Sequence, residues 1–158
     1  MAINQAMCTS FKIALLNGEM DFSSDTSQVF RIALYTSSAN LGEATETYGG
    51  TIGVSVDPNG ECPATGNYTA GGNILVVSTR PTDGGSGTTA YLSFADTTWA
   101  NATITARGAL IYKVGGTNPA VAVLNFVNDK TSTAGDFQVQ FPTANATSAI
   151  VRIATPSP

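Results

Sequence analysis

The sequence predicts an all-β domain, a sandwich or jelly roll of seven to eight strands, preceded by one N-terminal amphipathic α-helix. Apolar residues recur at three- and four-residue spacing near the N-terminus and alternate with polar residues thereafter. Turn-forming Gly, Pro and Asn separate the alternating segments at fairly even spacing. The 158 residues fit one domain, with the helix at 1–18, the sandwich at 29–154 and a short tail at 155–158.

The helical pattern lies at the N-terminus. Ile3, Met7, Phe11 and Leu15 recur every four residues and therefore share one face of the predicted helix. An Asn-Gly pair at 17–18 follows, and a glycine in this position ends helices because it takes the left-handed conformation freely. The apolar face can pack on the sheet of the same chain or dock on a neighbouring subunit, and both possibilities stay open.

Alternating segments predict the strands, and the clearest of them is 104–114. Strands are expected at 30–35, 73–79, 91–95, 104–114, 120–126, 136–141 and 149–154, with a weak one from Thr51 to Val56. Residues 81–87 and 115–119 have the composition of turns, and 129–135 that of a loop. The segment 39–72 shows no regular pattern, so we expect a binding loop or a segment ordered by contacts that the sequence does not reveal.

Charged residues are scarce, at 11 % of the chain against about 25 % in an average protein. Charged side chains are depleted at the centres of protein interfaces, so the composition suits a chain that meets other proteins, although Thr and Ser also suit exposed strands. Residues 19–61 hold seven acids and one base, a net charge of −6, and the rest carries +2. No basic stripe exists, so we expect no direct binding of nucleic acid.

Neither a membrane nor a secreted setting is expected. No apolar run approaches the roughly 20 residues that span a bilayer, and the N-terminus lacks the charged and apolar regions of a signal peptide. Cys8 and Cys62 are the only cysteines. We expect both to be free thiols in a reducing cytosol.

The sequence offers little for catalysis. It contains no histidine, which excludes Ser-His-Asp and Cys-His catalysis and histidine-ligated metals. The glycines at 84–87 lack the Lys-Ser/Thr of a phosphate-binding loop, and Pro58 interrupts the acidic spacing of a calcium loop. We therefore expect a protein that is not an enzyme, with no catalytic residue, no cofactor and no metal site.

A resemblance to known proteins runs through Ala2–Ala6 with Cys8–Lys12, Arg31–Ser37, Gly66–Gly72, Phe94–Trp99, Thr105–Tyr112 and Val139–Thr143 with Ile150–Ile153. These segments resemble small virion structural proteins of tailed bacteriophages. The likeness covers nearly the whole chain and departs at 49–63, where Pro58 and Cys62 look like an insertion. It implies a non-enzymatic component of the virion, made in the host cytoplasm, and it supplies no catalytic residues.

Within this setting, the leading hypothesis is a capsid decoration or cement protein that sits on the head as a trimer and bridges major capsid proteins. Candidate contact residues are Ile3, Met7, Phe11, Leu15, Trp99 and Arg107. Arg107 is expected to meet a carboxylate from the acidic 19–61 region of another subunit. One alternative is a tail-side connector, tail module or fibre anchor. Another is a carbohydrate-binding module for host attachment, with Trp99, Tyr48 and Tyr68 as exposed stacking residues.

Overall fold

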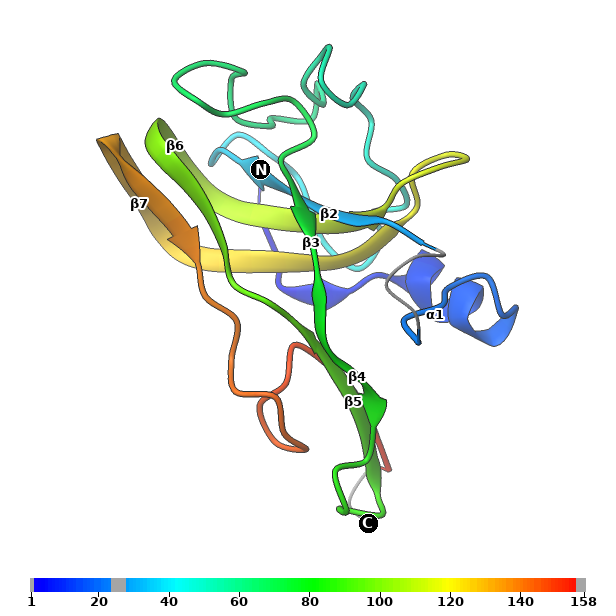
Figure 1. The fold of residues 1–158 in the computed structure, drawn as a ribbon. Helices are drawn as coiled ribbons and strands as arrows, with labels where there is room; N and C mark the ends of the chain where they lie inside the picture. Colours follow the sequence, from blue (N-terminus) through cyan, green and yellow to red (C-terminus); the bar gives the residue numbers. More distant parts are fainter. Residues whose placement is uncertain (1, 24–27, 156–158) are drawn as a thin grey trace.

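The computed structural model describes residues 2–23 and 28–155, which form two antiparallel sheets and one short helix (Figure 1). The prediction of an all-β sandwich with an N-terminal helix is confirmed. The elements are β1 (Ala6–Met7), α1 (Thr9–Leu16), β2 (Phe30–Tyr35), β3 (Asn73–Leu75), β4 (Val77–Thr82), β5 (Thr89–Phe94), β6 (Thr97–Lys113), β7 (Ala120–Val139) and β8 (Val151–Ala154). The larger sheet has the order β1-β7-β6-β2-β3, and the smaller one β4-β5-β8.

A long, bent hairpin of β6 and β7 forms the centre of the larger sheet (Figure 1). The half of β6 nearest the turn, from Gly108 to Lys113, also pairs with β2, whereas its other half pairs with β7 alone. The loop predicted at 129–135 is wrong, because these residues lie inside β7, with Thr131 opposite Thr105 on β6. Small polar residues fill this stretch, so it lacks the apolar alternation by which a strand is recognised.

The chain passes between the two sheets over very short connections. Only Val76 separates β3 from β4, and only residues 95–96 separate β5 from β6. The single strand predicted at 73–79 is therefore two strands that belong to different sheets. A hydrogen bond of 2.8 Å from the N–H of Ala95 to the carbonyl of Val76 joins the two crossing points.

The helix is shorter than predicted. It spans Thr9–Leu16 and excludes Ile3 and Met7, which the sequence pattern placed on its face. Met7 lies in β1 opposite Ala122 of β7, and Ile3 forms a parallel bridge with Leu41. Backbone pairing with the edge of the larger sheet thus competes successfully with helix formation before Cys8, the residue that precedes α1.

Aromatic side chains bind α1 and the smaller sheet to one face of the larger sheet. Phe22 stacks on Phe30 of β2 at a centroid distance of 4.4 Å and meets Phe11 of α1 edge-on at 5.9 Å. Phe94 of β5 lies 6.1 Å from Phe30. One phenylalanine of β2 therefore contacts groups from both covering layers, which closes the core on that side.

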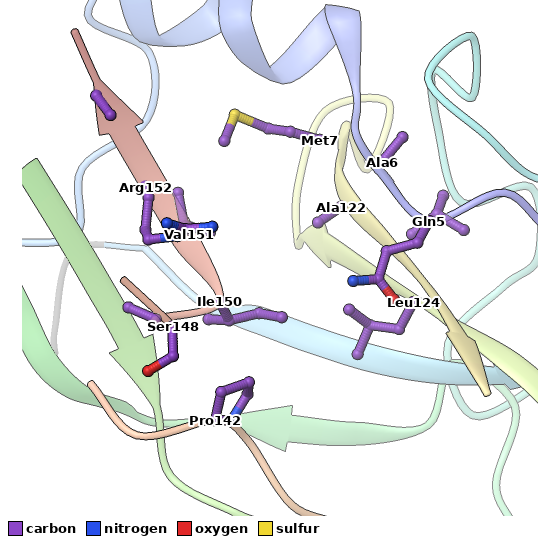
Figure 2. Close-up of a pocket in the computed structure, with 13 residues that line it drawn as sticks. Gln5, Ala6, Met7, Ala122, Leu124, Pro142, Ser148, Ile150, Val151 and Arg152 are labelled. Atoms are coloured by element: carbon purple, nitrogen blue, oxygen red, sulfur yellow. The ribbon is translucent and has the colours of Figure 1, made fainter. Parts of the chain in front are cut away.

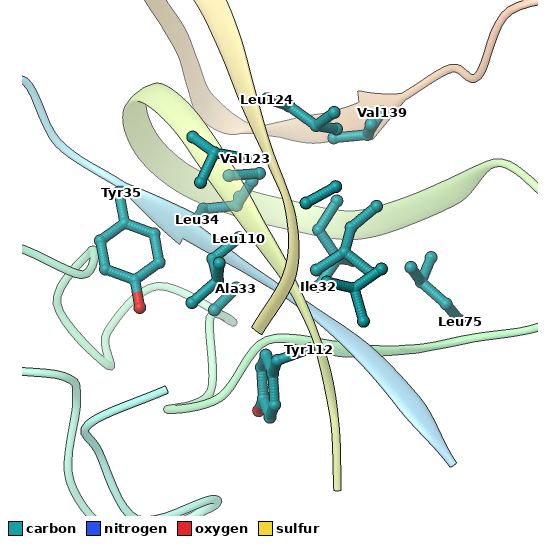
Figure 3. Close-up of a cluster of buried hydrophobic side chains, with 14 of the residues drawn as sticks. Ile32, Ala33, Leu34, Tyr35, Leu75, Leu110, Tyr112, Val123, Leu124 and Val139 are labelled. Carbon is teal, nitrogen blue, oxygen red and sulfur yellow. The ribbon is translucent and has the colours of Figure 1, made fainter. Parts of the chain in front are cut away.

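The centre of β6 is buried on both faces (Figure 3). Leu110 lies opposite Ala33 of β2 and Val123 of β7, while Ile111, on the other face, lies opposite Ile32. The phenylalanines and α1 cover the face of Ile111. Segment 39–72 covers the face of Leu110, which explains why this part of β6 carries few polar residues.

Several smaller expectations can also be compared with the structure. The weak strand at Thr51–Val56 is wrong, since only an isolated bridge joins Thr51 to Ser55 in a tight turn. Both cysteines are free and buried. Of the predicted tail only Thr155 belongs to the described part of the chain, and residues 156–158 lie outside it. The one described helix is too short to span a membrane.

Two isoleucines on neighbouring strands test where the core lies. Ile32 of β2 is fully buried, whereas Ile74 of β3 is 58 % exposed. Ile32→Ala should lower the free energy of unfolding by about 2–5 kcal/mol, because it leaves a cavity between the larger sheet and the layer that α1 and the smaller sheet form over it. The matched Ile74→Ala should cost less than about 1 kcal/mol. Urea denaturation measures both, and equal losses would contradict the assigned core.

Candidate functional site

The most distinctive site is a buried polar cluster that holds segment 39–72 against the larger sheet. It contains two carboxylates, Asp57 and Glu61, each 5 % exposed. Around them lie four buried tyrosines, Tyr35, Tyr48, Tyr68 and Tyr112. We call these six residues the tyrosine–carboxylate cluster.

A turn brings the two carboxylates together. The sequence Asp57-Pro58-Asn59-Gly60 has the composition of a turn. The Asp57 carboxylate accepts a hydrogen bond from the Asn59 N–H at 2.9 Å, as an aspartate commonly does at the start of a turn. The N–H of Glu61 donates back to the Asp57 carbonyl at 3.2 Å. Glu61 is thereby directed into the interior beside Asp57.

Glu61 accepts four hydrogen bonds. One carboxylate oxygen, Oε2, receives the Tyr48 hydroxyl at 2.8 Å and the Asp57 N–H at 2.6 Å. The other, Oε1, receives the Tyr68 hydroxyl at 2.7 Å and the Gly71 N–H at 2.7 Å. All four groups are donors, so the side chain acts only as an acceptor, as an ionised carboxylate does.

Asp57 joins the same segment to β2. Its Oδ2 accepts the Tyr35 hydroxyl at 2.7 Å and the Gly49 N–H at 3.2 Å. Tyr68, which donates to Glu61, accepts a hydrogen bond from the Leu34 N–H at 2.9 Å. The cluster therefore connects two neighbouring residues of β2 to three separate points of the covering segment.

The end of the segment is fixed at a pair of glycines. The Gly71 carbonyl accepts the Tyr112 hydroxyl at 2.8 Å and Arg31 Nε at 3.1 Å, and Arg31 Nη2 donates to the Gly72 carbonyl. A Cβ at Gly72 would lie 1.7 Å from the Ile32 carbonyl oxygen, and its φ is +65°. Only glycine allows the backbone to approach β2 this closely in this conformation.

The cluster is built to bind a loop rather than to react. The hydrogen bonds occupy the roughly four acceptor positions of the Glu61 carboxylate, which leaves none for a substrate. Burial raises the pKa of all four tyrosines above the ordinary range, and the nearby carboxylates raise the pKa of Tyr35, Tyr48 and Tyr68 further. These hydroxyls therefore stay protonated and remain donors.

The thiols are equally unreactive. Burial raises the pKa of Cys8 to about 11 and that of Cys62 to about 12. A thiol nucleophile needs the opposite shift, toward the thiolate at neutral pH. Neither cysteine has the chemistry of a catalytic group.

Sequence reasoning did not identify this cluster, although part of its signal was present. From the sequence we consider the acidic spacing around Pro58 only as a calcium loop, because the turn at 57–60 is usually a surface feature. Tyr112 stands at an inward position of the best predicted strand, and a buried phenol needs a polar partner. That requirement was the available signal, but it does not say which acceptor is used.

Three of the proposed contact residues are part of the chain's own core. Ile3 is 7 % exposed, Phe11 is fully buried, and Trp99 is 3 % exposed. Met7 and Leu15 are half-buried. The large apolar side chains that α1 does present to solvent are Ile13 and Leu16.

The aromatic surface expected of a carbohydrate-binding module is absent from the positions predicted for it. Tyr48, Tyr68 and Trp99 are each at most 3 % exposed, so no sugar can stack on them. Tyr48 stacks on Tyr112 instead, and Trp99 meets Phe137 edge-on. The prediction failed because the loop and the β6–β7 hairpin cover these rings.

Arg107 pairs within its own chain. Its Nε lies 2.7 Å from Oδ1 of Asp129, on the neighbouring strand β7. The carboxylate of another subunit that we expect for Arg107 from the sequence stays a prediction. The bulge in the β6–β7 register beside Gly108 places Asp129 within reach, and both side chains remain partly exposed.

Comparison with known proteins found no matching family model, no matching curated protein and no matching solved structure. Within residues 2–23 and 28–155, no three His, Cys, Asp or Glu side chains are grouped so that they could hold a metal ion.

Replacing the central carboxylate tests the role of the cluster. Glu61→Gln puts an amide NH₂ against two of the four donors, so we expect the free energy of unfolding to fall by about 3 kcal/mol or more. The control is Glu43→Gln, an exposed glutamate of the same segment, which should change it by less than about 0.5 kcal/mol. Chemical denaturation measures both, and a small effect at Glu61 would contradict the assigned role.

The raised pKa values of the tyrosines predict a loss of stability in alkali. Above about pH 10 the unfolded chain releases tyrosine protons that the folded cluster keeps, so unfolding becomes more favourable as pH rises. The stabilisation is complete below that pH and declines above it, by about 1.4 kcal/mol per pH unit for each retained proton. Denaturation series across this range measure the slope, and a flat profile between about pH 10 and 11 would be inconsistent with buried phenols.

Proposed function

We propose that this chain is a non-enzymatic structural protein of a tailed-phage virion, and specifically a decoration or cement protein that stabilises the head lattice. The observation that carries the proposal is an exposed face on the β6–β7 hairpin that has few charged side chains, which we call the sparsely charged face. The proposal also draws on the resemblance of the sequence to small virion proteins. The proposed role depends on extended contact surfaces and needs no reactive group.

The sparsely charged face lies on the half of the hairpin that projects beyond β2, and its charged side chains include Asp136 and the Arg107–Asp129 ion pair. Thr105 lies opposite Thr131, with their hydroxyls 3.1 Å apart, and Thr98 lies opposite Gln138. All four residues are exposed or nearly so. Neutral side chains such as these four can be buried against another protein at a low desolvation cost, because none of them carries a charge out of water.

Rigidity supports the same role. A cement protein stabilises a shell because it binds the assembled lattice better than the free subunits. The affinity of such binding is highest when the protein is ordered before it binds, since little conformational entropy is then lost. The tyrosine–carboxylate cluster supplies this order to segment 39–72, which would otherwise be a long irregular loop.

The amount and position of the chain in purified particles test the proposal. We expect many copies on the head surface, measured by quantitative mass spectrometry and by labelling of intact virions. Particles that lack the chain should lose their contents at a lower temperature than complete ones. A few copies confined to the tail would support the tail-side alternative instead, and absence from particles would contradict both.

A charge placed among the neutral residues of the sparsely charged face tests the contact itself. Thr105→Lys should reduce the occupancy of particles by about tenfold or more, because a charge would then be buried at the contact. Ser86→Lys, at the exposed β4–β5 turn, is the matched control and should leave occupancy unchanged. Equal occupancy of both variants would remove this face from the proposal.

A further inference from the structure

A cavity of about 390 Å³ lies between the edges of the two sheets (Figure 2). β1 and the adjoining part of β7 form one wall, and β8 with the segment before it forms the other. Met7, Leu124 and Ile150 give the cavity apolar side chains, while Gln5 and Arg152 give it polar ones. We call this cavity the edge slot.

β8 turns unpaired backbone groups toward the edge slot. In the described part of the chain it pairs with β5 alone. The Thr155 N–H donates to the carbonyl of Thr88, the residue opposite it, at 3.4 Å, so Thr155 and Thr88 are a hydrogen-bonded pair of the antiparallel strands. Bonded pairs alternate along antiparallel strands, so the N–H and C=O groups of Arg152 and Ala154 point away from β5. Both residues line the slot.

β1 is open on the opposite wall. It pairs with β7 alone among the described strands, and the Cys8 N–H donates to the Val121 carbonyl at 3.0 Å. By the same alternation, the backbone groups of Met7 point away from β7. The two walls of the slot are therefore strand edges with backbone donors and acceptors that lack a strand partner.

The geometry points to a binding site for an extended segment of another protein, which adds a strand to β8. The segment carries alternating apolar side chains and one carboxylate. Main-chain hydrogen bonds to Arg152 and Ala154 would provide affinity, and alternate side chains would enter the apolar part of the slot beside Met7 and Leu124. This inference rests on the slot alone and does not depend on the virion role.

Charge determines the chemistry of the partner. Arg152 is the one charged residue among the described residues that line the slot. Its Nη1 makes a long contact of 3.4 Å with the Ala146 carbonyl. A guanidinium presents five donors and matches a carboxylate in shape, so an acidic side chain in the bound strand fits this end of the slot.

We assign the segment to a different chain. The acidic stretch 39–72 of this protein is fixed by Asp57 and Glu61 and cannot supply an extended strand to a second copy.

Other open edges of the molecule fit a strand less well. β4 is irregular in its pairing with β5, and β7 contains bulges, with Val127 and Ala134 at positive φ. Such irregularities hinder the addition of a strand. β8 pairs with β5 without a register shift, so its free edge is regular.

Selection from a library of short random peptides tests the inference, with the purified protein as bait. The variant Gln5→Trp, in which an exposed residue is replaced by one that fills the slot, serves for counter-selection. We expect the enriched peptides to alternate apolar residues and to contain an acidic one. On binding, hydrogen exchange should slow at the amides of Arg152 and Ala154.

Charge reversal then identifies the acidic contact. Arg152→Glu should lower the affinity for the selected peptides by about tenfold or more. Replacing the acidic residue of the peptide with lysine should restore binding to that variant. Lys130→Glu, an exposed reversal on β7 outside the slot, should leave affinity unchanged.

Three results would overturn the inference. They are the absence of any enriched peptide, equal binding to Gln5→Trp, and protection confined to other strands. Protection of the slot amides in the protein alone, rising with its concentration, would show that a second copy occupies the slot and would overturn the assignment to a different chain.

Discussion

The structure depends on one buried carboxylate with four hydrogen bonds. Burial of a charge without partners would destabilise the fold by several kcal/mol, so every donor around Glu61 must be held in place. Tyr48, Asp57, Tyr68 and Gly71 come from separate parts of the same segment. This one acceptor therefore joins four points between Tyr48 and Gly71, and isolated bridges at Leu41, Thr47 and Glu61 attach the same segment to other parts of the chain.

This constraint shapes the rest of the molecule. Because segment 39–72 covers one face of β2 and β6, and α1 with the smaller sheet covers the other, the centre of the larger sheet is inaccessible. Surfaces that remain open to other molecules include the projecting half of the β6–β7 hairpin, the free edges of the strands and the Ile13 and Leu16 side chains of α1. The two proposals use the first two of these: the sparsely charged face for the lattice, and the β8 edge for an extended partner segment.

Sequence patterns predicted the elements that local physics determines. The alternation at 30–35 gave β2 its correct bounds, and the turn at 115–119 was placed correctly between β6 and β7. Local pattern could not show that Ala6 and Met7 pair with β7 and Ile3 with Leu41 instead of extending the helix, because β7 lies more than a hundred residues away along the chain. The cluster was missed for the same reason, since its hydrogen bonds join Tyr35 to Asp57 and Tyr112 to Gly71. Arg107 was recognised as a charge in need of a partner, but the bulge that brings Asp129 to it has no signature in the sequence.

Native-state hydrogen exchange at two amides tests most directly whether Glu61 secures the covering segment. The Asp57 and Gly71 N–H groups both donate to its carboxylate. If the cluster fixes the segment, these amides exchange only when the whole protein unfolds, with the same opening free energy as those at the centre of β2. Exchange through a local opening of much lower free energy, like that of an exposed turn such as 83–87, would contradict the account.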